Sequence, residues 1–270
     1  MSPRRAGKLR DRALVLRRHP YSESSLVVWV LTRQEGLVHL LARGAYRPRS
    51  RYFAVLDLFD ELELEWRPAR GGGDLGQLVE GRLLQRRRGP TRDLRSFRAA
   101  TTALELAAIG SRPGQPEPRL FDLLSGALDA LDRGEADPEA ILVEFELGFL
   151  REHGLAPALA RCASCDAEAP AEGAPPRVVF SAAAGGRLCR PCAAEQRAAG
   201  GRVGTLPLDV IEAAARMLDD EPVELSPDGL ERLHDFVERF LGHHLGVQPR
   251  SQRRFLAAPN RNAPRPAPTR

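Results

Sequence analysis

The spacing of the apolar residues changes near Pro90, and this change limits the folds open to the chain. Before Pro90, short aliphatic runs alternate with polar turns in the manner of β-strands. After it, segments such as Arg92–Ile109 carry apolar residues three and four positions apart, as amphipathic helices do. Strands followed by helices predict an α+β protein. The 270 residues suffice for two modest domains, or for one domain with a small inserted module.

Five segments before Pro90 are predicted to be strands: 13–16, 26–32, 37–42, 53–66 and 75–84. The turn before the third contains Gly36, which readily adopts the positive φ that tight hairpins need. In the fourth, Leu62 and Leu64 are expected on one face, and the acidic residues between and beside them on a solvent-exposed face, namely Glu61, Glu63 and Glu65. Five short antiparallel strands predict a closed barrel over residues 1–84. The OB-fold is the usual nucleic-acid-binding example, although the pattern alone fits an SH3-like barrel as well.

Five later segments are predicted to be helices: 92–109, 120–131, 138–153, 207–218 and 227–244. Two of them begin with a capping residue followed by proline at the first helical position, Asp137-Pro138 and Ser226-Pro227. We expect them to form a helical domain from residues 85–160 and 195–246. Residues 247–270 contain five prolines, six arginines and no acidic residue, and are expected to be a basic, disordered tail.

All four cysteines of the chain fall in one motif, the pairs Cys162-x-x-Cys165 and Cys189-x-x-Cys192. Two thiolates two residues apart can face one ion, and two such pairs complete a tetrahedron around Zn²⁺. The interval between the pairs contains a short strand candidate, Val178–Phe180, and predicts a β-hairpin that returns to the metal. Residues 161–194 are therefore expected to be an inserted four-cysteine zinc module with one structural ion, because four thiolates leave no open coordination position.

Two other interpretations of the cysteines are possible, disulfide bonds and a pair of redox centres. A cytoplasmic setting argues against disulfides. A thioredoxin-type redox site needs only one such pair, placed next to a βα junction. Zinc is the favoured interpretation.

The charge of the chain is distributed unevenly. Residues 1–51 contain twelve basic and three acidic residues, a net charge of +9, whereas the whole chain has +4. The remainder is therefore net acidic. Because Lys8 is the only lysine, codon preference explains why the cations are arginines, but it does not explain why acidic residues are scarce in this region. The imbalance favours contact between the N-terminal region and a polyanion such as nucleic acid.

The segment between the third and fourth predicted strands combines cations with aromatic rings, as single-strand binders do. Arg17 and Arg18, near Tyr21, could form a second edge of the same site. Arg86, Arg87 and Arg88 either extend this basic face or lie in a solvated linker. Tyr52 is expected to pack inside the barrel, and Tyr46 either stacks on a base or caps the rim. The predicted DNA contacts are Arg17, Arg18, Arg43, Tyr46, Arg47, Arg49, Arg51, Arg86, Arg87 and Arg88.

Motifs for catalysis are missing from the sequence. Lys8 is not followed by serine or threonine, so no nucleotide-binding loop of the Walker type is present. No GxSxG motif or nuclease-like set of carboxylates occurs, and the histidines lack the spacing of metal ligands, so they are given no role. We therefore expect no enzymatic activity.

No apolar run approaches the ~20 residues that a membrane-spanning helix needs. The basic N-terminus is followed by only a short apolar stretch, Ala13–Leu16, which is too short for a signal peptide. A cytoplasmic protein without membrane contact is expected.

Several short strings, taken in their order along the chain, resemble the bacterial RecO family. In the N-terminal part they are Ala13–Leu16, Tyr21–Ser25 and Ala42–Ala45. The cysteine pairs followed by helices, and the ending His244-Leu245-Gly246 with Phe255-Leu256, resemble the rest of that family. The resemblance covers nearly the whole chain.

This resemblance implies an OB-fold, a helical domain and an inserted zinc module. It further implies binding of single- and double-stranded DNA and annealing of complementary strands at the nucleoid. The implied partners are RecR, the single-strand DNA-binding protein SSB and, indirectly, RecA, which would be loaded onto SSB-coated strands. From another class, a zinc-stabilised RNA-binding or ribosome-associated OB-fold protein would fit the same barrel, cysteines and basic patch. A nuclease or ligase subunit ranks third.

Overall fold

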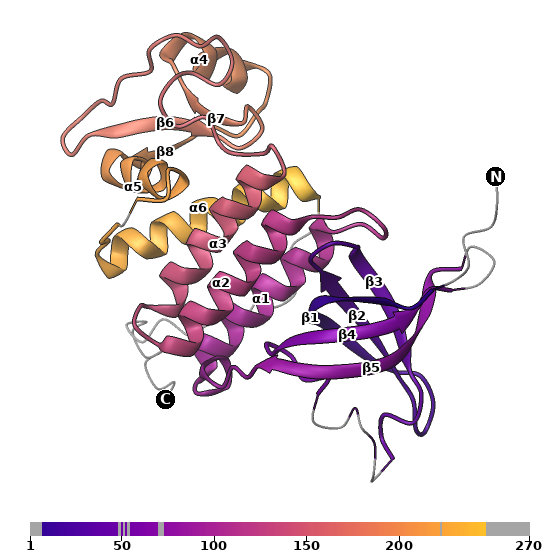
Figure 1. Cartoon of the computed structure of the whole chain (residues 1–270). Coiled ribbons are helices and arrows are strands. Elements are labelled where there is room, and N and C mark those ends of the chain that lie inside the picture. Colours follow the sequence, from indigo (N-terminus) through magenta and orange to yellow (C-terminus); the bar gives the residue numbers. More distant parts are fainter. Residues whose placement is uncertain are drawn as a thin grey trace, which may run out of the picture.

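The computed structural model describes residues 7–47, 50, 52, 55–69, 73–221 and 223–246. A β-barrel lies at one end of the molecule, a group of helices in the middle, and a small cysteine-bearing module at the other end (Figure 1). The α+β prediction is thus confirmed. Two of the predicted DNA contacts, Arg49 and Arg51, and the predicted tail 247–270 lie outside the described residues.

The barrel closes in the order β1-β2-β3-β5-β4. Its strands are β1 (Leu9–Pro20), β2 (Leu26–Thr32), β3 (Gly36–Ala42), β4 (Glu61–Arg67) and β5 (Leu75–Gln85). One pair, β3 with β5, is parallel, so the expectation of purely antiparallel strands was wrong for this pair. A parallel pair needs a long crossover connection, which here runs through residues 43–60 and β4. This Greek-key order is that of an OB-fold and excludes the SH3-like alternative.

The fourth strand is shorter than predicted. It begins at Glu61 rather than near residue 53, because the chain before it turns, and Phe59 adopts a left-handed φ of 74°. Glu61, expected on a solvent-exposed face, is buried, while Leu62 and Leu64 fill the barrel interior as predicted. The outer face of the barrel near Glu61 is therefore covered by another part of the chain.

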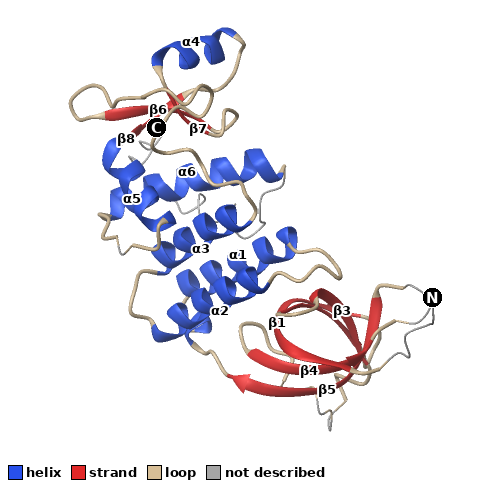
Figure 2. Ribbon diagram, turned by 45° about the horizontal axis from the view of Figure 1, so that its top comes forward, coloured by secondary structure: helices blue, strands red, loops and turns tan. Residues whose placement is uncertain are grey.

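The covering elements are helices. The helical part consists of α1 (Leu94–Gly110), α2 (Pro118–Arg133), α3 (Pro138–Glu152), α5 (Leu208–Leu218) and α6 (Pro227–Leu245), with a short 3-10 turn η1 (Gly89–Thr91) leading into it (Figure 2). Leu14, Leu31 and Leu37, on the outer face of the barrel, belong to the same apolar core as these helices. Among the described helices, none is both long and apolar enough to cross a lipid bilayer.

Each predicted helix is present, with ends within two residues of the predicted ones. The predicted caps account for two of the starts. The Asp137 side chain accepts a hydrogen bond from the backbone N–H of Glu139, and Ser226 Oγ accepts one from the N–H of Gly229.

The cysteine-bearing module contains a sheet of three strands in the order β7-β6-β8 and one helix. These elements are β6 (Arg177–Ser181), β7 (Gly186–Leu188), α4 (Arg190–Ala198) and β8 (Gly204–Pro207). The predicted hairpin is formed by β6 and β7, with Val179 opposite Leu188. Two elements were not predicted, α4 and β8. β8 lies within residues 195–246, which were assigned to the helical domain although no helix was predicted before residue 207, and it pairs with β6 across Val179 and Thr205.

Candidate nucleic-acid interface and metal centre

The four cysteines come together in the small module. Cys162 and Cys165 precede β6, whereas Cys189 and Cys192 lie at the junction of β7 and α4, and all four sulfur atoms lie within 4.8 Å of one another. The Sγ atoms of Cys165 and Cys189 are 3.7 Å apart. Four thiolates bound at about 2.3 Å around one tetrahedral ion have their sulfurs about 3.8 Å apart. A disulfide would need about 2.05 Å. The cluster could therefore hold one metal ion.

The electrostatics of the cluster also favour a cation. Burial disfavours the thiolate of Cys162, but hydrogen bonds from the backbone amides of Cys189, Ser164 and Cys165 outweigh it and lower the pKa of Cys162 to about 6. The pKa of Cys192 is instead raised, chiefly by hydrogen bonding with Cys165 and Cys189. Four sulfurs this close cannot all be anionic by themselves. A bound divalent cation would allow all four to deprotonate.

The predicted basic loops meet at one end of the barrel. The backbone N–H of Tyr46, after β3, donates to the carbonyl of Ser24 in the β1–β2 turn at 3.1 Å. Tyr21 and Tyr46 are 62% and 43% exposed, and Arg43 and Arg47 are exposed beside them. Two stretches that looked like separate edges in the sequence therefore form one surface, which we call the loop end of the barrel: Tyr21, Arg43, Tyr46 and Arg47.

Tyr52 belongs to the interior, as expected. Its ring is buried in the barrel core, and its hydroxyl donates to the carbonyl of Val79 at 3.0 Å. This contact fixes the crossover segment against β5, below the loop end.

The remaining predicted arginines lie in different surroundings. The guanidinium of Arg17 lies 5.1 Å from the ring centroid of Trp29, and Arg18 forms an ion pair with Asp57 at 3.1 Å. Arg86 forms an ion pair with Asp60 at 3.4 Å, while Arg88 is exposed.

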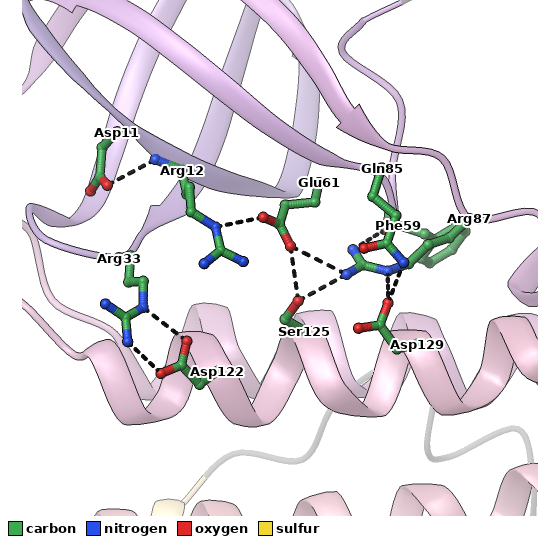
Figure 3. Close-up of polar contacts among 10 residues, drawn as sticks. All are labelled: Asp11, Arg12, Arg33, Phe59, Glu61, Gln85, Arg87, Asp122, Ser125 and Asp129. Atoms are coloured by element: carbon green, nitrogen blue, oxygen red, sulfur yellow. Dashed lines mark hydrogen bonds and ion pairs between the residues drawn. The ribbon is translucent and has the colours of Figure 1, made fainter.

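The structure contradicts the predicted role of Arg87 as a DNA contact. Its side chain is 0% exposed, and its guanidinium donates to the carbonyl of Phe59 at 3.0 Å, to Ser125 Oγ at 2.8 Å and to Asp129 Oδ1 at 2.6 Å (Figure 3). β5 ends at Gln85, and the chain then passes between the barrel and α2. The side chain of Arg87 is therefore buried, whereas Arg86 and Arg88 are exposed. Because Arg87 does not reach solvent, the prediction that it contacts DNA was wrong.

Arg87 belongs to a polar junction that joins the barrel to α2. Glu61 Oε1 accepts from Arg12 at 2.6 Å, its other oxygen accepts from Ser125 at 3.1 Å, and Arg33 donates twice to Asp122, at 2.9 and 2.8 Å (Figure 3). Burial by itself would raise the pKa of Glu61, but the hydrogen bonds and cations around it hold this pKa below its ordinary value. We call this group of residues the junction network: Arg12, Arg33, Glu61, Arg87, Asp122, Ser125 and Asp129.

The sequence contains a signal for this junction that our sequence analysis missed. Asp122, Ser125 and Asp129 are spaced three and four residues apart on α2, so they lie along one face of that helix. A polar row that lies next to the buried apolar face of this amphipathic helix, and that includes the buried Ser125, indicates a polar partner surface.

A second feature was also missed, on the outer face of β1, β2 and β3. Trp29 stands directly opposite Arg17 on one side and His39 on the other in the strand register. The ring centroids of Trp29 and His39 are 4.6 Å apart, and those of Trp29 and His19 are 5.7 Å apart. We call Arg17, His19, Trp29 and His39 the aromatic row. The period-two alternation with the buried Val28 and Val30 placed Trp29 outward, but it could not show which residues stand beside it.

Comparison with known proteins covers both halves of the chain. Residues 6–87 match the family model described as Recombination protein O N terminal, and residues 91–253 match Recombination protein O C terminal. A DNA repair protein RecO from Anaeromyxobacter sp. (strain K) is 39% identical over 253 residues, which cover 90% of this chain and 93% of that relative. The corresponding protein of Myxococcus xanthus (strain DK1622) is 32% identical over 239 residues, 87% of this chain and 92% of that relative.

Proposed function

This chain belongs to the recombination protein O family of DNA repair proteins, and we propose that it is a DNA-binding recombination mediator rather than an enzyme. It binds single- and double-stranded DNA and anneals complementary strands without ATP. Together with RecR it helps to load RecA onto single strands coated with SSB, in the cytoplasm at the nucleoid. Partner identities follow from the family resemblance, and the mode of DNA binding follows from the surfaces described above.

The observation that carries this proposal is the loop end of the barrel. Exposed Arg43 and Arg47 stand beside exposed Tyr21 and Tyr46 on two loops that are hydrogen-bonded to each other. Arginines can contact phosphates and tyrosines can stack on bases, and OB-folds bind oligonucleotides with loops and strands of this region. The net charge of +9 over residues 1–51 adds the long-range attraction that brings a polyanion to this surface.

The metal in this proposal is one Zn²⁺, held by Cys162, Cys165, Cys189 and Cys192. Four thiolates are soft ligands, and four sulfur atoms within 4.8 Å of one another can surround one tetrahedral ion, which suits zinc. The ion supplies a cross-link within the module and no chemistry, because the four sulfurs fill its coordination sphere. The ligands join the segment before β6 to the start of α4.

We expect the loop arginines to set the salt dependence of single-strand binding. For single strands, log K falls with log salt by ~0.7 per phosphate neutralised. Replacing Arg43, Arg47, Arg49 and Arg51 together with alanine is therefore expected to flatten this slope by up to about 3 units. The measurement is fluorescence anisotropy of a labelled oligonucleotide at several salt concentrations.

The matched control removes the same charge elsewhere, from exposed arginines of the helices and the cysteine-bearing module. They are Arg133, Arg161, Arg190 and Arg216, each paired with a nearby acidic residue. The control should leave the slope close to that of the wild type. Equal flattening in both variants would mean that net charge, and not the loop end, determines binding.

Annealing is expected to proceed without ATP and to depend on the basic C-terminal segment. Two strands repel each other through their phosphates, so a protein that anneals them needs a second basic surface besides the loop end. Residues 249–270 contain six arginines and no acidic residue. Truncation before Pro249 should slow annealing of complementary strands, while single-strand affinity at moderate salt changes by less than about tenfold.

A variant that keeps the segment but replaces its six arginines with glutamine separates charge from length, and it should anneal as slowly as the truncated protein. Unchanged annealing in both variants would place the second surface in the folded part. A full-length protein that fails to anneal DNA, or that prefers RNA, would contradict the mediator function and support the RNA-binding alternative.

A further inference from the structure

A groove separates the cysteine-bearing module from α6, the helix over which the module lies (Figure 1). Its volume is about 750 Å³. Residues 202–206, which include most of β8, form one wall, and Gly242 and His243 of α6 belong to the other. The buried rings of Phe180 and Phe236, with centroids 4.5 Å apart, provide its apolar base. The groove lies within the range of ~300–1,000 Å³ that is usual for binding pockets.

The walls of the groove leave room for a bulky side chain. Ala182, Ala183, Gly204 and Gly242 line it, and a Cβ placed on Gly204 would meet no atom within 4 Å. Among the described strands β8 pairs only with β6, so its second edge can pair with a further extended segment. The groove therefore suits an extended peptide that carries a large apolar residue.

The chain contains such a segment close to the groove. α6 ends at Leu245, two residues after His243 on the groove wall, and Gly246 then adopts a left-handed φ of 64°. Phe255-Leu256 is the only pair of large apolar residues in the sequence after Gly246. The nine residues from Gly246 to Phe255 span up to ~30 Å when extended, which is enough to reach the groove.

The prolines of this part of the chain leave one stretch able to pair with a strand edge. They are Pro249, Pro259, Pro264, Pro266 and Pro268, so residues 250–258 contain none. Proline lacks the backbone N–H that a β-ladder needs, and its absence is a requirement for pairing with β8. Phe255 and Leu256 lie within this proline-free stretch.

We propose that residues 250–258 dock into the groove of their own chain, with Phe255 and Leu256 as the apolar contact and the backbone beside the second edge of β8. Because the segment is attached to α6 by a short linker, its effective concentration at the groove is in the millimolar range, so a weak contact suffices. Docking holds Arg250, Arg253 and Arg254 beside the groove as a localised cationic surface.

The charges on both sides give this docking an unusual salt dependence. Arg202 and Arg239 line the groove, and although Arg239 is paired with Asp235 at 3.3 Å, the wall remains basic like the segment. Salt screens the repulsion between like charges and does not weaken apolar contacts. Docking should therefore become stronger as salt is raised, whereas phosphate binding becomes weaker.

Hydrogen–deuterium exchange of the full-length protein without DNA tests the proposal. Relative to their intrinsic rates, the amides of residues 250–258 should exchange about tenfold more slowly than those of residues 260–270, and the difference should grow with salt. Phe255→Ser combined with Leu256→Ser should abolish this protection and speed exchange in residues 202–206. Ala257→Ser combined with Ala258→Ser is the matched control and should keep the protection within about twofold.

Two further variants test the contact from the groove and show which chain is bound. Gly204→Leu places a side chain in the groove and should release the segment as the Phe255 and Leu256 changes do. With p-benzoylphenylalanine in place of Phe255, irradiation should cross-link the segment to β8 or α6 of the same chain.

Exchange of residues 250–258 at their intrinsic rates in the wild type would overturn the proposal, and so would protection that survives both the double serine change and Gly204→Leu. Cross-links that join two chains would also overturn it, because they assign the segment to the groove of a second copy. None of these measurements involves DNA, so their failure is distinct from a failure to bind or anneal strands.

Discussion

Cys189→Ser is expected to reduce the zinc content from about one ion per chain to a small fraction of that and to unfold the cysteine-bearing module. Cys189 is buried, and its sulfur lies 3.7 Å from that of Cys165. Zinc binding by small four-ligand sites contributes ~10–16 kcal/mol, which a module of this size cannot replace. Its own apolar cluster has five buried members, Cys162, Ala169, Leu188, Cys189 and Ala193, two of which are the proposed ligands.

The unfolding should remain local, because the barrel has a separate apolar core. Elemental analysis measures the metal, and limited proteolysis shows where the chain becomes accessible, with new cleavages expected between residues 161 and 203. Ser164→Ala, an exposed change between two ligands, is the control and should retain the ion. Wild-type protein that contains no zinc after purification without chelator would exclude this structural metal.

Arg87→Met is expected to lower the free energy of unfolding by about 3–5 kcal/mol, because it leaves buried acceptors without their cation. Glu61 is buried, and it would lose one of its charged partners at the junction while Arg12 remains. Since Arg12 partly compensates, the lower end of this range is expected. Chemical denaturation followed by circular dichroism measures the change.

Arg88→Met is the matched control. Arg88 is the neighbouring residue, has the same chemistry and is exposed, so its replacement should change stability by less than about 0.5 kcal/mol. Adding Glu61→Gln to Arg87→Met should recover part of the loss, because the double variant no longer buries a carboxylate that has lost one of its two cations. Equal effects of the two arginine changes would show that the burial of Arg87 has no energetic consequence.

The secondary structure was predictable where local signals determine it. Asp137 and Ser226 define the starts of α3 and α6 through hydrogen bonds to residues two and three positions away. β2 was placed without error because it is a continuous apolar run in which every second residue from Leu26 is buried. The parallel pairing of β3 with β5 was not predictable from such signals, since it depends on where a crossover of many residues places the chain.

The same distinction applies to the sites. The cysteine cluster could be predicted because its spacing alone brings two thiols of each pair to one ion. Arg86, Arg87 and Arg88 are identical in sequence terms, and only the position of α2 determines that the middle one is buried. The aromatic row depends on the register of three strands, which places Trp29 next to His39, ten residues away in the sequence.

The direct succession of β8 and α5 has a mechanical consequence. β8 ends at Pro207 and α5 begins at Leu208, whose backbone N–H donates to the carbonyl of Pro176 next to β6. No linker residue separates β8 from α5. At this connection the cysteine-bearing module therefore cannot change its orientation without bending or unwinding the first turn of α5. Stress on the module, such as chelation of its ion, should therefore appear first as faster amide exchange in that turn, ahead of any change in the barrel.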